Sequence, residues 1–297
     1  MVGSSGSLAV VVCCRDRAAL LEQALARTSA ALEPGDELVV VDSASSDPEV
    51  QAVARRAGAR VVVCAEPGLS VARNAGWIAT TSSVVAFTDD DCRPLPGWRD
   101  ATLAAFADDR VGAAWGDVRA DRDSEVPLSS GAVEDRELDV DSVLSSIGHG
   151  ACMAFRRDAL EAIRGFDELL GAGGVFRAGE DKDALWRVFA GGWRVLPAPA
   201  MAVTHVVHRD TAEATRVMRG YGVGAGAVAR KRVVDVGLRR VVRDELWLHG
   251  ALPVLRSARH GRWAASRAAL ARTRGFLLGW RRAGRLPVVD GHLTRRG

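Results

Sequence analysis

The chain has 297 residues, of which 48% are hydrophobic and 26% are charged, and these proportions are ordinary for a globular protein. Lysine and arginine total 40 and aspartate and glutamate 37, and the basic part lacks a recognition motif, which disfavours a nucleic-acid binder. The charge is uneven, because residues 209–297 contain 20 basic and 6 acidic residues, as in a segment that meets an anionic surface.

Apolar runs and helical patterns alternate over the first ninety residues. We expect strands at residues 8–14, 37–41, 60–64 and 84–87, and helices at residues 17–32, 49–57 and 69–79. This alternation predicts an α/β fold with a parallel sheet, right-handed crossovers and helices on both faces. Because the first strand is apolar throughout, it should be buried on both faces.

The fourth strand ends in three consecutive acids, Asp89, Asp90 and Asp91. Open α/β sheets bind ligands at the carboxyl ends of their strands. Adjacent carboxylates repel one another, so a positive group should lie there, and a hard cation such as Mg²⁺ or Mn²⁺ fits. The alternative is a solvated acidic turn. The first strand is not followed by a dinucleotide-binding glycine pattern, and the chain has no phosphate-binding loop of the Gly-Lys-Ser/Thr type.

The five cysteines have no spacing typical of a zinc site, and we expect buried, reduced thiols and a cytoplasmic protein. No run has the features of a signal peptide or the length of a membrane span.

Four segments, in this order and spacing, resemble the family-2 glycosyltransferases of the GT-A fold. They are Cys-Cys-Arg-Asp-Arg at 13–17, Asp-Ser-Ala-Ser-Ser-Asp at 42–47, Ala-Arg-Asn-Ala-Gly at 72–76 and the three acids at 89–91. The resemblance continues through residues 150–157, Gly-Phe-Asp-Glu at 165–168, Glu-Asp at 180–181 and the histidine segment at 203–208, and covers about the first 230 residues. Two positions depart from the family pattern: Arg15 replaces an aromatic residue and Cys152 replaces an asparagine.

The resemblance implies a mostly parallel, Rossmann-like sheet flanked by helices. It implies a catalytic domain at 1–208, with a nucleotide-sugar half at about 1–118 and an acceptor half at about 119–208. We expect residues 209–297 to form a basic, helical C-terminal extension, in which Trp and other apolar residues alternate with Arg. Such an element suits an anionic membrane surface, and would place the protein at the inner face of the membrane. The alternative is a helical cap with solvated arginines.

The family donor is a nucleoside diphosphate sugar, and the family cofactor is a divalent metal, Mn²⁺ or Mg²⁺. The resemblance implies that Asp91 contacts the metal directly, and that Asp89 meets the ribose or reaches the metal through water. It places Asp90 with the nucleotide-sugar-binding group, although its side chain could instead point into the fold. His205 would be a further metal ligand, with His208 as the second choice.

Three further roles follow from the same resemblance. Asp42 would accept a hydrogen bond from the nucleotide base, the alternative being an aspartate that caps a turn. Arg73 would pair with the diphosphate, the alternative being an exposed helix arginine. Asp181 would be the catalytic base that takes the proton of the acceptor hydroxyl, with Glu180 as its neighbour and alternative.

The function implied is an inverting, metal-assisted transfer of a single hexosyl or deoxyhexosyl group from a UDP-, GDP- or TDP-sugar. The acceptor would be a cell-envelope glycan, a lipid-linked saccharide or a small natural product. The Gln-x-x-Arg-Trp signature of processive synthases is absent. The competing functions are a nucleotidyltransferase acting on sugar phosphates, and a catalytically inactive scaffold that binds sugar nucleotides.

Overall fold

The computed structural model describes residues 7–121, 150–206, 211–241, 243, 247, 250–260 and 263–295. It divides into two compact units, Met1–Phe166 with Ala184–His208, and Asp167–Asp183 with Arg209–Gly297. The second unit thus contains the C-terminal extension predicted from the sequence. It also contains residues 167–183, which the sequence-based division assigns to the acceptor half.

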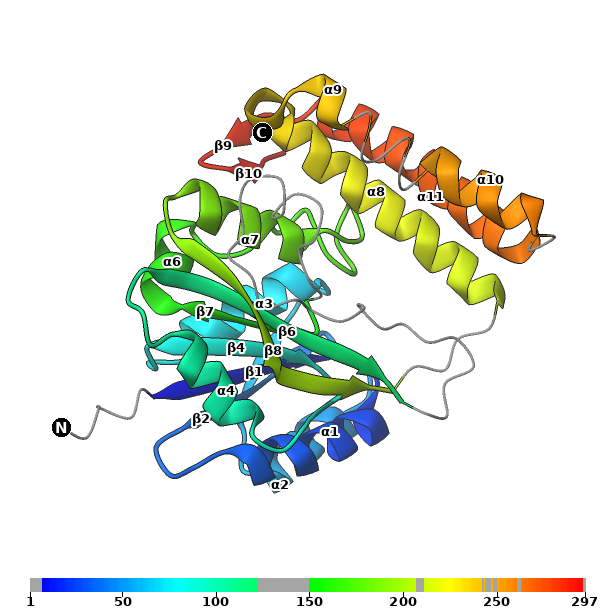
Figure 1. Ribbon diagram of the computed structural model, residues 1–297. Coiled ribbons are helices and arrows are strands. Elements are labelled where there is room, and N and C mark those ends of the chain that lie inside the picture. The colour runs from blue at the N-terminus through cyan, green and yellow to red at the C-terminus, as the bar shows by residue number, and fades with distance from the viewer. Residues whose placement is uncertain are drawn as a thin grey trace. The chain divides into compact units, whose positions relative to one another are not determined.

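The first unit is built on an eight-stranded sheet of order β3-β2-β1-β4-β7-β6-β8-β5 (Figure 1). Its strands are β1 (Leu8–Cys14), β2 (Glu37–Ser43), β3 (Arg60–Cys64), β4 (Val84–Asp89), β5 (Cys92–Pro94), β6 (Val111–Ala120), β7 (Cys152–Arg156) and β8 (Arg194–His205). Strands β3, β2, β1 and β4 are parallel, as are β6 and β8, whereas β7 and β5 run antiparallel to their neighbours. The prediction of a mostly parallel α/β sheet is therefore confirmed.

Helices cover both faces of this sheet, as predicted (Figure 1). They are α1 (Ala18–Ala31), α2 (Glu49–Arg56), α3 (Leu69–Ile78), α4 (Trp98–Ala105), α6 (Arg157–Ala162) and the part of α7 (Glu180–Ala190) from Ala184 on. On one face, Val10, Val12 and Val40 share a core with the buried side chains of α1 and α2. The intervening Val11 faces α3, where a Cβ on Gly76 would lie 2.3 Å from its Cγ1 atom. This alternation follows from the two-residue period of a strand.

Two strands extend beyond the apolar runs that predict them. Parallel pairing continues as far as Cys14 opposite Asp42 and Cys13 opposite Asp89. The predicted ends at residues 41 and 87 are therefore wrong by two residues, because the hydrogen-bond ladder does not stop where side chains become polar. Both acids are thus held by sheet backbone rather than by a loop.

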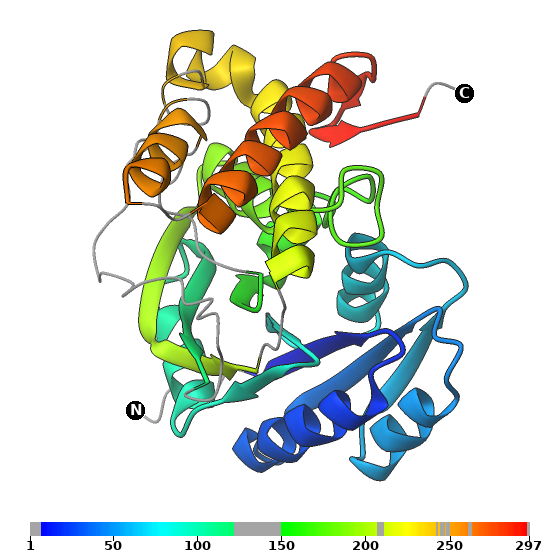
Figure 2. The same cartoon turned by 90° about the vertical axis from the view of Figure 1, so that its right-hand side faces the viewer.

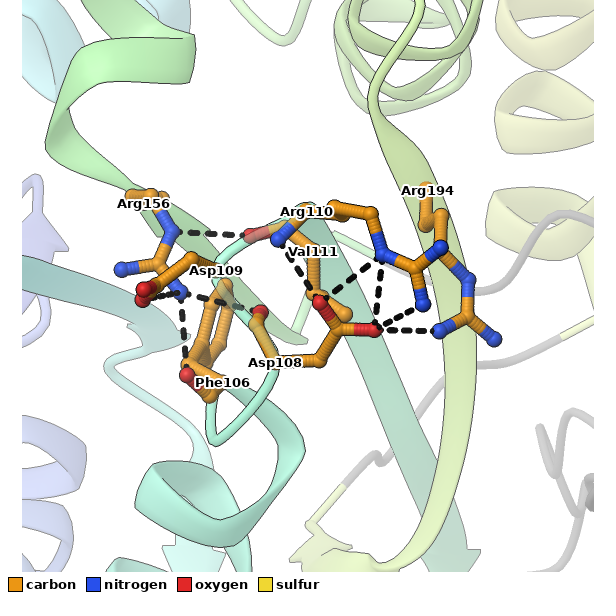
Figure 3. A network of polar contacts seen from close by, with 7 residues as sticks. All are labelled: Phe106, Asp108, Asp109, Arg110, Val111, Arg156 and Arg194. Atoms are coloured by element: carbon orange, nitrogen blue, oxygen red, sulfur yellow. Dashed lines mark hydrogen bonds and ion pairs between the residues drawn. The ribbon is translucent and has the colours of Figure 1, made fainter.

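A polar network lies at the end of the sheet opposite to Asp42 and Asp89 (Figure 3). The Asp108 carboxylate lies 2.9 Å from an Arg110 nitrogen and 2.6 Å from one of Arg194. Hydrogen bonds from Arg110 and Arg194 hold the pKa of Asp108 well below its ordinary value. Arg156 donates to the backbone carbonyls of Phe106, Asp108 and Val111. The network thereby ties together the starts of β6 and β8 and the end of β7.

The second unit is helical. It contains α8 (Thr211–Val236), α9 (Leu238–Val241), α10 (Leu252–Arg259), α11 (Trp263–Ala283) and a hairpin of β9 (Val288–Val289) and β10 (His292–Leu293). Helices α8 and α11 lie side by side in both views (Figures 1 and 2). Their backbones touch through glycines, since a Cβ on Gly226 would lie 2.1 Å from the Phe276 carbonyl oxygen and one on Gly279 2.0 Å from that of Val223.

Candidate active site at the carboxyl edge of the sheet

The sheet register brings Asp91 and His205 together from distant parts of the chain. Strand β5 begins at Cys92, which pairs antiparallel with His205 at the end of β8. The Nε2 atom of His205 lies 3.1 Å from Oδ1 of Asp91, and the Val206 amide donates to the Asp91 carbonyl at 2.9 Å. The sequence pairs these two residues only through the family resemblance, because nothing in their spacing predicts that β5 joins β8.

Arg17 supplies a positive charge to the three acids. Its Nε atom donates to Oδ2 of Asp90 at 3.0 Å. Its Nη2 atom donates both to Oδ1 of Asp90 and, at 2.9 Å, to Oδ2 of Asp91. Asp90 is almost fully buried beneath this contact. Arg17 is the last residue of the family-like segment at 13–17, but the sequence alone does not predict a role for it. Its place directly after the first strand, at the edge that carries the acids, is the signal that could have identified it.

Arg73 is buried beside the end of β4, at 2% exposure. The alternative of an exposed helix arginine is therefore wrong. Its Nη2 atom lies 3.3 Å from Oδ1 of Asp89 and donates to the carbonyl of Gly150 at 3.1 Å. The guanidinium also lies 5.7 Å from the ring centre of Phe166. These contacts hold a full positive charge beneath the edge of the sheet.

Asp42 is buried at the end of β2 and organises the turn that follows. Its Oδ1 atom accepts a hydrogen bond from the Ser45 amide at 2.9 Å, and its Oδ2 atom accepts one from Nε2 of Gln51 at 2.8 Å. The turn-capping role considered from the sequence is therefore present. Each carboxylate oxygen has two acceptor sites, so these contacts leave room for a further donor.

Burial and the neighbouring cations shift the pKa values of Asp89 and Asp91 in opposite directions. Burial raises the pKa of Asp89, although Arg73 acts against the shift. Burial also acts to raise the pKa of Asp91, but the hydrogen bond with His205 and the charge of Arg17 outweigh it and hold this pKa below its ordinary value. Asp91 is thereby kept as a carboxylate, the form that binds a cation.

The donor atoms near Asp91 fit a hard divalent cation. Within the described part of the chain, one oxygen of Asp91, the sulfur of Cys92 and a nitrogen of His205 lie within 4.8 Å of one another. Burial raises the pKa of the Cys92 thiol well above its ordinary value, which disfavours the thiolate form that would bind a metal. The remaining ligands are a carboxylate and an imidazole. Mg²⁺ and similar ions commonly take few protein ligands and complete their shell with phosphate oxygens and water. His208 lies outside the described residues.

Comparison with known proteins identifies the family. The profile of glycosyl transferase family 2 matches residues 9–164, which is more than half of the chain. The chain belongs to glycosyl transferase family 2. The matched region includes the ends of β1, β2 and β4 and therefore Arg17, Asp42, Arg73 and the three acids.

Curated and solved family-2-like proteins resemble this chain to different extents. The pre-mycofactocin glycosyltransferase of Mycobacterium tuberculosis is 29% identical over 182 residues, which cover 58% of this chain and 37% of that protein. The chain thus spans little more than a third of the length of this relative.

Solved structures confirm the GT-A fold. The mannosyltransferase PcManGT of Pyrobaculum calidifontis, in complex with GDP-Man and Mn²⁺, superposes with a TM-score of 0.65 at 21% identity, covering 93% of this chain and 88% of that one. The S. aureus TarS 1–349 structure in complex with UDP-GlcNAc gives a TM-score of 0.58 at 16% identity, covering 98% and 96%.

The two departures of this family-2 chain from the family pattern have different surroundings. Arg15 is exposed beside Asp16, at 3.7 Å. Cys152 is fully buried, and its Sγ atom donates to the carbonyl of Met201 at 3.2 Å. All five cysteines are free and four of them are buried, in agreement with the sequence prediction.

The predicted base lies in the second unit of this family-2 protein. Glu180 and Asp181 form the first turn of α7, where Glu180 is buried and Asp181 is half-buried. The Oδ1 atom of Asp181 accepts a hydrogen bond from the Lys182 amide at 2.7 Å. Acids in a first helical turn are stabilised by the helix dipole, so this placement alone is compatible with either a structural or a catalytic role.

Proposed function

We propose that this protein is an inverting glycosyltransferase that moves a single hexosyl or deoxyhexosyl group from a nucleoside diphosphate sugar to a hydroxyl acceptor. The observation that carries the proposal is the contact between Asp91 and His205, at 3.1 Å, at an edge where Arg17 and Arg73 supply positive charge. A nucleoside diphosphate needs both features, because two phosphates leave the sugar together and their charge must be balanced.

Asp91 and His205 would hold a divalent cation, Mn²⁺ or Mg²⁺, and Asp89 would reach it through water or meet the ribose. Such a cation, when bound, acts as a Lewis acid toward the leaving diphosphate. Arg73 adds positive charge next to Asp89, at 3.3 Å, and its fixed guanidinium suits phosphate oxygens. Asp90 contributes to the nucleotide-sugar site by fixing Arg17. Asp42 accepts a hydrogen bond from the base.

Asp181 acts as the general base, with Glu180 beside it. The acceptor hydroxyl loses its proton to the carboxylate of Asp181 while its oxygen attacks the anomeric carbon from the face opposite the nucleotide. The bond from the anomeric carbon to the diphosphate breaks in the same step, so the configuration inverts and no covalent sugar–enzyme intermediate forms.

Related proteins support a nucleotide-sugar donor. The mannosyltransferase PcManGT is described with GDP-Man and Mn²⁺, and TarS with UDP-GlcNAc. The relative from Mycobacterium tuberculosis is named a pre-mycofactocin glycosyltransferase. The acceptor classes considered for this chain are a cell-envelope glycan, a lipid-linked saccharide and a small natural product.

The function is tested by sugar transfer from a panel of UDP-, GDP- and TDP-sugars, followed as release of the nucleoside diphosphate. Asp181→Asn and Asp91→Asn should each lower kcat by roughly 10²-fold or more. Asp100→Asn is the matched control, because that carboxylate is exposed at 78%. Near-parental rates in both variants would reject the assignment. Nucleotide binding without any transfer would favour the inactive scaffold.

The second unit also has features of a peripheral membrane-binding element. Trp247 and Trp263 are exposed at 52% and 65%, and Leu255 at 58%. Residues 209–297 supply 20 basic residues. Apolar side chains next to arginines bind the interface of a membrane rich in anionic lipids. Along the described residues, the structure contains no helix that is both long and apolar enough to cross a bilayer.

Sedimentation of the full chain with vesicles containing phosphatidylglycerol tests this membrane proposal. Trp247→Ala and Trp263→Ala should weaken binding together by roughly tenfold, since each tryptophan loses most of its apolar contact area. Ile78→Ala is the control, because Ile78 is an exposed apolar residue of the first unit, at 66%. Equal sedimentation of the parent, the double tryptophan variant and the Ile78→Ala variant would contradict membrane binding through these tryptophans.

A further inference from the structure

The second unit contains a buried cluster of charges that the sequence analysis does not anticipate. The Nζ atom of Lys231 lies 2.7 Å from Oδ2 of Asp167 and 2.7 Å from Oδ1 of Asp183. The side chains are 6%, 0% and 1% exposed, respectively. The Leu293 amide donates to the same oxygen of Asp167 at 2.7 Å. Removing these charges from water is costly, and the cost is offset only when the charged groups are held in a well-defined geometry.

This cluster joins α8 to the first turn of α7. Asp183 lies two residues after Asp181 and three after Glu180, and its amide donates to the Gly179 carbonyl at 3.0 Å. Arg232, which follows Lys231 on α8, donates to the backbone carbonyl of Lys182. Both lysine–aspartate pairing and this backbone contact therefore act within two residues of the proposed base.

One face of α8 supports the whole segment that leads to the base. A Cβ on Gly224 would lie 2.3 Å from the Ala178 carbonyl oxygen, and one on Gly179 would lie 3.0 Å from a methyl carbon of Val228. Gly224, Val228 and the pair at 231–232 recur at helical spacing, so they share a face. The helix backbone thus touches residue 178, its side chains touch 179, and its charged groups hold 182 and 183.

We propose that Lys231 is a positioning residue for the catalytic base, and that α8 is part of the catalytic apparatus rather than only a C-terminal extension. The buried lysine fixes Asp183, Asp183 fixes the first turn of α7, and that turn fixes the direction of the Asp181 carboxylate. This inference rests on the proposed function, in which Asp181 takes the acceptor proton. It requires only contacts inside the second unit.

Lys231 can be tested against an exposed positive charge of the same unit. The side chain of Lys231 is buried, whereas Arg281 on α11 is exposed. Lys231→Met in the full chain should lower kcat by on the order of 10²-fold, as expected when a reacting group is misplaced by about 1 Å. The donor KM should change less than about twofold, because the nucleotide site is untouched. Arg281→Met, which also replaces a cation by methionine, should leave kcat within about twofold of the parent.

A double variant separates positioning from simple stability. Lys231→Met removes the ammonium group that contacts two buried carboxylates and should lower the melting temperature. Adding Asp183→Asn removes one of these charges and should recover part of the melting temperature. The proposal predicts that kcat stays low in the double variant and that amide hydrogen exchange at residues 178–184 stays faster than in the parent. Recovery of kcat together with melting temperature would overturn it, as would a parental kcat in Lys231→Met.

The outcome is distinguishable from failure of the proposed function. If Asp181→Asn abolishes transfer while Lys231→Met does not, the base assignment stands and only the positioning role is rejected. If Asp181→Asn retains transfer, the base assignment is wrong and the positioning role falls with it.

Discussion

Single side chains decide where charge lies at the carboxyl edge of the sheet. His205 and Arg17 hold the pKa of Asp91 below its ordinary value, whereas burial raises the pKa of Asp89. Two neighbouring acids of the same type therefore differ in protonation behaviour because their partners differ. This difference favours Asp91 as the direct ligand of the proposed cation.

Arg73→Lys tests the buried cation. One nitrogen of Arg73, Nη2, contacts both Asp89 and the Gly150 carbonyl. Lysine keeps the charge, but its compact ammonium group lacks the further donors of the planar guanidinium, which suit phosphate oxygens. We expect the donor KM to rise about tenfold, which corresponds to roughly 1.4 kcal/mol of lost binding. Arg119→Lys is the control, because Arg119 is exposed at 56%. A donor KM equal to that of the parent would contradict the role given to Arg73.

Asp36 gives a pH-dependent test of stability. Burial acts to raise the pKa of Asp36, but the hydrogen bond from Arg99, at 2.6 Å, and two backbone amides outweigh it, so the pKa lies below its ordinary value. A carboxyl with a lowered folded-state pKa stabilises the fold above its unfolded pKa, about 3.9, and loses this contribution as the pH falls through the folded pKa.

Asp36→Asn should therefore lower the free energy of unfolding by about 2 kcal/mol at pH 7, and by less as the pH falls below about 4. Urea unfolding of parent and variant at several pH values measures this difference. A difference that grows toward low pH would contradict the sign of the shift.

At the level of elements, the alternation of four strands and three helices is predictable because the strands are uninterrupted apolar runs. The runs of β1 and β4 are buried on both faces, whereas the edge strand β3 is partly exposed. The strands that complete the sheet are not predictable in this way. β5 is only three residues long, and both β5 and β7 pair antiparallel in a mostly parallel sheet. The partners of Arg17 and Lys231 are likewise not predictable, since they lie far away in sequence and their pairing depends on tertiary packing. The family resemblance, rather than periodicity, is what places His205 near Asp91.

The packing of α8 against α11 is sensitive to the addition of a single methyl group at a glycine. At Gly226 an added Cβ would lie 2.1 Å from a backbone oxygen of α11, whereas at Gly220 its nearest neighbour is a side-chain carbon 3.7 Å away. Gly226→Ala should destabilise the protein by about 2 kcal/mol through overpacking. Gly220→Ala, on the same helix, should stabilise it by about 0.5–1 kcal/mol through helix propensity. Thermal unfolding of both variants tests this, and equal effects would contradict the close contact of the two helices.

At the scale of the whole molecule, charge is divided along the chain. Residues 1–208 contain 20 basic and 31 acidic residues, and residues 209–297 contain 20 and 6. If the basic part binds an anionic membrane, raising the salt concentration should weaken vesicle binding, because ionic attraction is screened. Binding to vesicles of neutral lipid should depend little on salt. Binding that is unchanged between 50 mM and 500 mM salt would contradict an electrostatic contribution.

The central claim is that the edge of the sheet around Asp91 binds a cation together with a nucleoside diphosphate. Calorimetric titration of the full chain with UDP, GDP and TDP, each with and without Mn²⁺, tests it most directly. The account predicts that one of these nucleotides binds only when Mn²⁺ is present, and that Asp91→Asn abolishes this dependence while Asp100→Asn preserves it. Metal-independent binding of equal strength, or parental binding by Asp91→Asn, would contradict it.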